Sequence, residues 1–157
     1  MRIIDLFSGV GGLTFGFYYR KYKDHFVRNR KNQFVFANEY NPLAAKAYSE
    51  NYPDIPMKNC DIKSLKESDI RKWIGSEPVD LIIGGPPCQS FSTVGQRNYD
   101  EKAQLYTEYL RVLKIARPKM FLFENVRGIL SMREIFYKRD AAGNILYELK
   151  DVEGRES

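Results

Sequence analysis

Hydrophobic and polar positions divide the chain into short apolar runs separated by longer segments of mixed character. The apolar runs predict strands at 2–7, 34–38, 79–83 and 120–123, with a brief one closing at 61–62. The longer segments predict helices at 11–19, 42–52, 64–73 and 103–117. Because strands that alternate with helices form parallel sheets covered on both faces, the pattern predicts an α/β fold with a mostly parallel sheet.

Two segments fit this alternation poorly. Residues 20–32 are a basic connector, longer than the usual link, and are interpreted as a contact surface or, as is commoner for a run of charges, a solvated loop. Residues 136–157 are polar and charged, with one further strand predicted at 145–149. We therefore expect one domain at 1–135, followed by a polar tail or by the start of a missing C-terminal part.

Composition narrows the class of protein. The 157 residues are 43% hydrophobic and 29% charged, which is typical of a globular chain, and no apolar run approaches the roughly 20 residues that span a bilayer. No secretory signal is recognisable, so we expect a cytoplasmic location without membrane contact. The net charge of +5 suits a polyanion partner without deciding the matter. Cys60 and Cys88 are interpreted as separate thiols, as in a reducing compartment.

Glycines and acidic residues follow successive predicted strands. The turn at 5–12 (DLFSGVGG) supplies glycines that permit positive φ and close backbone approach to a ligand. Glu39 ends the second strand, where a carboxylate can accept hydrogen bonds from ribose hydroxyls. Asp61 ends the third, where it either reaches an adenine amino group or caps the next helix. Since ligands of open parallel sheets bind at the carboxyl ends of strands, these features together predict a nucleotide-like site.

A cysteine and a glutamate follow the next two strands. Cys88 comes directly after Pro86-Pro87, whose fixed φ angles hold it just beyond the fourth strand, and this placement favours a nucleophile over a buried structural thiol. Glu124 ends the following apolar run. If the two strands are neighbours, Glu124 faces Cys88 across a small planar substrate; otherwise it is a surface residue.

This combination resembles the cytosine carbon-5 DNA methyltransferase family, in its bacterial restriction-modification form, over roughly residues 2–131. The motifs that carry the resemblance are, in order, DLFSGVGG at 5–12, Glu39-Tyr40, Cys60-Asp61-Ile62, GGPPCQSFSTVGQR at 84–97 and ENVRG at 124–128. The PPCQSFS and ENV pair is highly specific. The resemblance implies a Rossmann-like methyltransferase sheet that binds S-adenosylmethionine, without a metal ion.

The family's functional residues map onto this sequence by motif. Glu39 would hold the cofactor ribose, Tyr40 would pack on the adenine, and Asp61 would meet the adenine edge. The cofactor contacts implied are Phe7, Gly9, Gly11, Gly12, Glu39, Tyr40, Asp61, Ile62, Pro86 and Leu105. The substrate contacts implied are Pro87, Gln89, Ser90, Ser92, Arg97, Asn125 and Val126. Among these contacts, the segment 90–97 would close over the base, and Arg97 would contact a phosphate. Asn125 would hold the geometry of the loop that follows Glu124.

The implied reaction is methyl transfer to carbon 5 of cytosine in duplex DNA. Cys88 would add to carbon 6 of the ring, and Glu124 would hydrogen-bond the ring nitrogen and supply the proton that offsets the developing charge. Both faces of the base must be reached, so the cytosine would be flipped out of the stack.

The sequence also departs from the family. Family members continue with a Gln-x-Arg-x-Arg segment, a target-recognition domain, a last helix and two further sheet strands, none of which is recognised here. We therefore expect an incomplete fold that needs a missing C-terminal part or a second polypeptide for activity. The alternatives are a tRNA cytosine methyltransferase, an inactive cofactor-binding fragment or subunit, and, least specifically, a nucleotide-binding Rossmann module.

Overall fold

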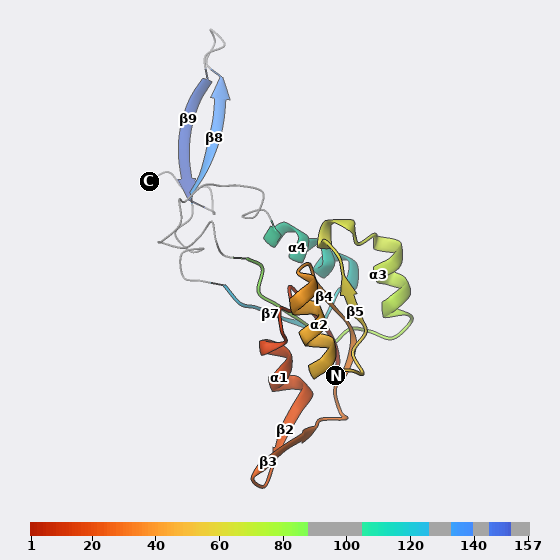
Figure 1. Cartoon of the computed structure of the whole chain (residues 1–157). Helices are drawn as coiled ribbons and strands as arrows, with labels where there is room; N and C mark the ends of the chain where they lie inside the picture. Colours follow the sequence, from red (N-terminus) through yellow and green to blue (C-terminus); the bar gives the residue numbers. More distant parts are fainter. Residues whose placement is uncertain (88–104, 126–132, 140–144, 152–157) are drawn as a thin grey trace. The chain divides into compact units, whose positions relative to one another are not determined.

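The chain divides into two compact units. The computed structural model describes residues 1–87, 105–125, 133–139 and 145–151, the last two ranges as backbone strands (Figure 1). The described residues 1–86 and 105–124 form the first unit. The second contains strands β8 (Arg133–Arg139) and β9 (Ile145–Asp151), which pair antiparallel. The five-stranded sheet, the helices and the β2–β3 hairpin described below belong to the first unit.

A parallel sheet of five strands forms the centre of the first unit. Its order is β5-β4-β1-β6-β7, and every neighbouring pair is parallel. The strands are β1 (Arg2–Leu6), β4 (Gln33–Glu39), β5 (Met57–Asn59), β6 (Leu81–Gly84) and β7 (Met120–Phe123). Along the chain, β4 and β5 are added in turn on one side of β1. The chain then crosses to the other side of β1, where it forms β6 and β7. The predicted mostly parallel sheet is confirmed.

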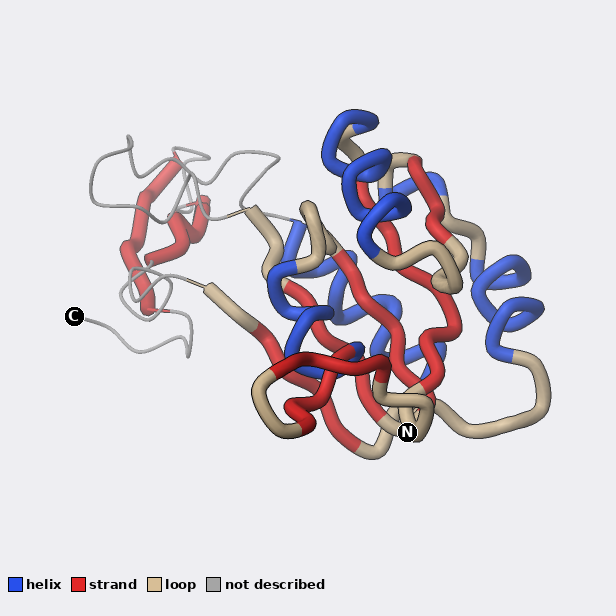
Figure 2. The backbone as a smooth tube through the Cα atoms, turned by 60° about the horizontal axis from the view of Figure 1, so that its bottom comes forward, coloured by secondary structure: helices blue, strands red, loops and turns tan. Residues whose placement is uncertain are grey.

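Helices cover both faces of this sheet, and each face has its own hydrophobic core (Figure 2). Side chains alternate along a strand, so Ile3 packs with α1 and α2, whereas Ile4 packs with α3 and α4. The helices are α1 (Gly12–Tyr18), α2 (Pro42–Asn51), α3 (Glu67–Ile74) and α4 (Leu105–Ala116). None of the helices in the described part of the chain has the length and hydropathy to span a membrane.

The third strand lies earlier than its predicted end at 61–62. β5 spans Met57–Asn59, and Asp61 instead caps the 3-10 turn η1 (Ile62–Ser64), accepting from the backbone N–H of Lys63 at 2.9 Å. An Asp side chain that bonds the backbone two residues on favours a turn over a continuing strand. This turn also delays the next helix, which begins at Glu67 and not at 64.

The basic connector is a hairpin, so the prediction of a solvated loop was wrong. Strands β2 (Tyr19–Tyr22) and β3 (His25–Arg28) pair antiparallel, and Lys23 at the turn has φ 53°. The sequence has no Asn-Gly or Asp-Gly signal for such a turn, which is why the pattern of charges concealed it. The strand predicted at 145–149 is present as β9, while its partner β8 was missed.

Candidate functional site at the carboxyl ends of the strands

The turn after β1 has three residues with positive φ, and two of them are glycines. Phe7, Gly9 and Gly11 have φ values of 55°, 55° and 94°, in the left-handed region. The backbone N–H of Ser8 donates to the carbonyl of Asn38 at 3.0 Å, which ties the turn to β4. A Cβ atom at Gly11 would overlap the Tyr52 ring, whose hydroxyl donates to the Gly11 carbonyl at 2.8 Å. The glycine therefore lets the turn lie directly against the end of α2.

Glu39 joins the turn to the next strand and helix. One carboxylate oxygen, Oε2, accepts from the backbone N–H of Gly9 at 2.8 Å, and the other, Oε1, accepts from that of Asn41 at 2.7 Å. Asn41 caps α2, accepting from the backbone N–H groups of Leu43 and Ala44. Each carboxylate oxygen retains a second lone pair. Glu39 is therefore fixed in orientation and still able to accept hydrogen bonds from a ligand's hydroxyls.

The residues after β4 and β5 lie beside Glu39. Asn59 donates to the carbonyls of Glu39 at 2.8 Å and Tyr40 at 3.1 Å, which brings the two strand ends together. Tyr40 is 73% exposed and Asp61 is exposed, so both are accessible to a ligand. Ile62 is buried in the core beneath α3 and α4, with only 3% of its surface exposed.

A buried polar network supports the turn from the side of α1 and α2. Thr14 donates to Asp5 Oδ2, and its hydroxyl lies 2.9 Å from the Tyr48 hydroxyl. Burial raises the pKa of Asp5 from 3.8 to about 7, against the opposing effect of these hydrogen bonds. Two buried oxygens, Asp5 Oδ1 and Ser8 Oγ, have no hydrogen-bond partner among the described residues. Sequence reasoning missed this network because Thr14 and Tyr48 lie on two different helices.

On the other side of β1, the ends of β6 and β7 hold Glu124. Its backbone N–H donates to the carbonyl of Gly84 at 2.9 Å, and its side chain is exposed. A Cβ atom built on Gly85 would lie 2.7 Å from Glu124 Oε2. The glutamate carboxylate therefore lies directly against the backbone that leads to Pro86 and Pro87. Beneath it, Tyr109 of α4 donates to the carbonyls of Ile82 and Leu122, both at 3.1 Å.

The predicted site residues lie in the first unit, in the second unit or outside the described residues. The structure gathers those after β1, β4 and β5 at one edge of the sheet, and places Glu124 at the same edge beyond β6. Pro86 is buried in the first unit and Leu105, at the start of α4, is half-buried. Pro87 and Asn125 belong to the second unit. The remaining predictions lie outside the described residues, namely Cys88, Gln89, Ser90, Ser92, Arg97 and Val126.

Two residues that hold this edge together escaped the sequence reasoning. Asn38 donates to the carbonyls of Lys58 and Cys60, both at 2.9 Å, and Asn59 holds the ends of β4 and β5 as described above. Asn38 is almost fully buried at the end of an apolar strand. The signal available in the sequence was Asn38 itself, a polar residue in an apolar run directly before Glu39.

The sheet order and the groups at its carboxyl edge define a Rossmann-like α/β domain. The chain belongs to the C-5 cytosine-specific DNA methylase family, whose sequence profile matches residues 1–152.

Several relatives share more than a third of the aligned residues. The type II methyltransferase M.AgeI of Thalassovita gelatinovora is 42% identical over 135 residues, which cover 84% of this chain and 29% of the relative. M.AquIA of Picosynechococcus sp. is 37% identical over 134 residues, covering 83% of this chain and 50% of the relative. The chain thus spans between about a third and a half of the length of these relatives.

Solved structures show the same fold. A DNA modification methyltransferase encoded within an E. coli prophage superposes with a TM-score of 0.65 at 34% identity, covering 83% of this chain and 33% of that one. The S. pombe Dnmt2 methyltransferase superposes with a TM-score of 0.56 at 25% identity, covering 82% of this chain and 34% of that one.

Proposed function

We propose that this chain carries the cofactor-binding and nucleophile-bearing part of an enzyme that methylates carbon 5 of cytosine in DNA. The observation that carries the proposal is the position of Glu124, whose carboxylate lies against Gly85, three residues before Cys88. We assign the nucleophile to Cys88 and the acid to Glu124 because both stand in motifs that resemble those of the C-5 cytosine-specific DNA methylase family, to which the chain belongs. A proton donor and a thiol on adjoining segments are what addition to an electron-poor ring requires.

The edge formed by β1, β4 and β5 fits S-adenosylmethionine. Glu39 keeps lone pairs for the ribose hydroxyls, and Tyr40 offers an exposed ring for the adenine. Asp61 is exposed two residues after Asn59, which donates to the carbonyls of both. A Cβ atom at Gly9 or Gly12 would meet open space, so the backbone of this turn is accessible to a ligand. Phe7, Gly11, Ile62, Pro86 and Leu105 complete the proposed contacts. The cofactor supplies the electrophilic methyl group.

The proposed chemistry begins with the thiolate of Cys88, which forms a bond to carbon 6 of a flipped cytosine. Glu124 donates a proton to the ring nitrogen as that bond forms, so the electron density moves to carbon 5. A bound cofactor would supply the methyl group to carbon 5 and would leave as its thioether. The carbon 5 hydrogen would pass to water as a proton while the bond from carbon 6 to the Cys88 sulfur breaks, and the ring nitrogen would return its proton to Glu124. Further contacts to base and backbone are proposed for Pro87, Gln89, Ser90, Ser92, Arg97, Asn125 and Val126.

The free edge of the sheet supports the need for a further part, either in the same protein or in a second polypeptide. In the part of the chain that the structure describes, β7 is the last strand at one edge of the sheet, and its apolar side chains Met120, Phe121 and Leu122 are 55%, 61% and 38% exposed. Exposed apolar side chains on an edge strand mark a surface that another segment covers. We therefore propose that the isolated chain binds the cofactor. It methylates DNA only when the further part completes the enzyme.

The decisive experiment measures methyl transfer to duplex DNA by the completed enzyme carrying Cys88→Ser or Glu124→Gln. We expect both variants to lose methyl transfer while calorimetry shows unchanged cofactor binding. Methyl transfer that survives Cys88→Ser would overturn the mechanism. Competition between duplex DNA and tRNA separates DNA methylation from the tRNA alternative, and turnover by the chain alone would exclude an inactive fragment.

A further inference from the structure

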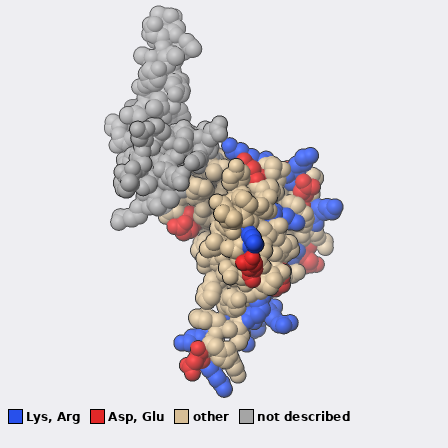
Figure 3. Space-filling view, viewed as in Figure 1, with Lys and Arg blue, Asp and Glu red and all other residues tan. Residues whose placement is uncertain are grey.

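The positive charge of the protein is concentrated on the β2–β3 hairpin and the link that follows it. Residues 20–32 contain six cationic side chains and one acidic side chain, Asp24, an excess equal to the net charge of +5 of the whole chain. The rest of the sequence is therefore balanced in charge. The space-filling view shows Lys and Arg gathered over this part of the molecule (Figure 3). The cationic residues are Arg20, Lys21, Lys23, Arg28, Arg30 and Lys31.

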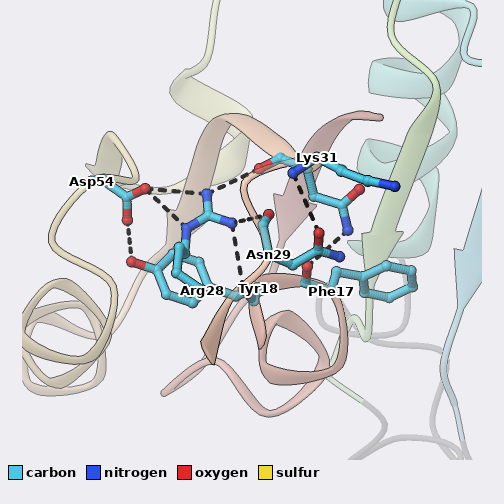
Figure 4. A network of polar contacts seen from close by, with 7 residues as sticks. Phe17, Tyr18, Arg28, Asn29, Lys31 and Asp54 are labelled. Atoms are coloured by element: carbon cyan, nitrogen blue, oxygen red, sulfur yellow. Dashed lines mark hydrogen bonds and ion pairs between the residues drawn. The ribbon is translucent and has the colours of Figure 1, made fainter. Parts of the chain in front are cut away.

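One of these cations anchors the hairpin to the domain (Figure 4). Arg28 donates to Asp54 Oδ2 from Nε at 3.2 Å and from Nη2 at 3.1 Å, and to the carbonyls of Asn29 at 2.6 Å and Asn32 at 3.0 Å. Its guanidinium carbon lies 3.9 Å from the centre of the Tyr18 ring, and the Tyr18 hydroxyl donates to Asp54 Oδ1. The base of the hairpin is therefore held in one geometry before any partner binds.

The cations nearest the tip remain available. Arg20, Lys21 and Lys23 are exposed, and no ion pair within the described part of the chain involves them. Tyr22 and Phe26 on the same ribbon are 48% and 57% exposed, and Arg20 and Lys23 lie within 5.8 Å of the Tyr22 ring centre. Cations interleaved with exposed aromatic side chains are typical of surfaces that bind nucleic acid.

The hairpin lies at the opposite edge of the sheet from the candidate site (Figure 1). It connects the end of α1 to the start of β4, whereas Glu39 ends β4. The seven residues of β4 separate the two places by about 20 Å, at roughly 3.3 Å per residue. Phosphates bound by the hairpin are therefore not those beside a cytosine held near Glu124.

We propose that the β2–β3 hairpin binds the sugar-phosphate backbone of duplex DNA without regard to sequence, away from the methylated base. This proposal rests on the proposed function, which makes DNA the substrate. Duplex DNA carries one charge per roughly 1.7 Å of its axis, so three cations at the tip of a two-stranded ribbon can each meet a phosphate. The hairpin adds affinity and leaves the chemical step unchanged.

The test measures the affinity of the full chain for a labelled duplex of random sequence between about 0.05 and 0.2 M salt. The variant Arg20→Gln/Lys21→Gln/Lys23→Gln should weaken binding at least tenfold at the lowest salt and reduce the salt slope by about 2 to 3, at about 0.9 per phosphate contact. The matched control, Lys66→Gln/Lys72→Gln/Lys114→Gln, removes the same charge from exposed positions outside the hairpin and should change the slope little. The variant Lys21→Arg/Lys23→Arg, which keeps the positive charge, should retain the salt slope of the unmodified chain.

Equal losses in the hairpin and control variants would overturn the proposal, because net charge alone would then explain them. Loss of tRNA binding with duplex binding intact would overturn the choice of DNA. Cofactor binding, measured by calorimetry, should be unchanged in the hairpin variant and confirms that the domain is folded. Failure of the proposed function appears separately, as methyl transfer that survives Cys88→Ser in the completed enzyme.

Discussion

At the scale of single residues, Gly85 leaves room for the carboxylate of Glu124. The space that a side chain would need there is taken by the carboxylate of Glu124, which is exposed and whose backbone N–H donates to the carbonyl of Gly84. The nearest atom is the end of a flexible side chain, so a methyl group at position 85 would displace that carboxylate without forcing the backbone to move.

We therefore expect Gly85→Ala to impair catalysis more than stability. Moving Glu124 should lower methyl transfer by the completed enzyme about 10²-fold, the low end for general acid catalysis. Urea unfolding should show little change in the free energy of unfolding. The control is Gly16→Ala, within α1 and with open space around its Cβ position, which should leave methyl transfer unchanged. Equal activity of both variants would show that Glu124 needs no such space.

Asp5 gives the stability of the domain a dependence on pH. Burial raises its pKa from 3.8 to about 7, so between these values the folded chain keeps a proton that the unfolded chain has lost. The resulting stabilisation is complete below pH 4 and is lost as the pH rises through 7. Asp5→Asn removes this titration, so its free energy of unfolding should rise relative to the unmodified chain by up to about 4 kcal/mol across this range.

The measurement is urea unfolding of both proteins at a series of pH values. Other carboxylates titrate in the same window but are common to the two proteins, so only the difference between them reports on Asp5. A difference that stays constant from pH 4 to 8 would contradict the raised pKa.

At the scale of elements, the β2–β3 hairpin depends on one arginine. Arg28 satisfies the carbonyls of Asn29 and Asn32 as well as Asp54, and its side chain is largely buried while that of Asp54 is half exposed. Without Arg28 the Asn29 carbonyl keeps the backbone N–H of Asn32 as a donor, at 3.1 Å, but the Asn32 carbonyl loses the guanidinium N–H. Losing that hydrogen bond together with the ion pair costs more than losing an exposed ion pair alone.

Arg28→Ala should lower the free energy of unfolding by about 1–2 kcal/mol and speed amide hydrogen exchange in β2 and β3 before the rest of the sheet. Arg30→Ala, an exposed neighbour with the same charge, should change stability by less than about 0.5 kcal/mol. If the two substitutions had equal effects, the contacts of Arg28 would not be what holds the hairpin.

At the scale of the whole molecule, the free edge beyond β7 should make the isolated chain associate with itself. Edge strands present unpaired backbone groups, and here exposed apolar side chains accompany them. Sedimentation velocity over a range of concentrations should detect this association, and Phe121→Lys should reduce it. Leu110→Lys, at an exposed apolar position on α4, is the matched control. Association that is identical in both variants would place the contact elsewhere.

The helices and most strands of the sheet could be predicted because their pattern is local, although the strand at 120–123, expected to be buried, is largely exposed. The runs 81–83 and 120–123 are apolar at every position, and Asn41-Pro42 begins a helix through contacts within a few residues. The run of charges at 20–32 led to the wrong prediction of a loop, because the residues that order the hairpin, Tyr18 and Asp54, lie outside this segment.

By itself the sequence determined the α/β class and the family, since these depend on motifs and periodicity within short segments. The residues that carry cofactor and substrate chemistry stay a prediction from those motifs. Tertiary structure decided how those segments combine. It brought Glu39 onto the backbone of Gly9, set the carboxylate of Glu124 against Gly85, buried Asp5 between two helices and left β7 at the edge. Contacts of this kind join residues far apart in the chain, and only packing in three dimensions fixes which of them meet.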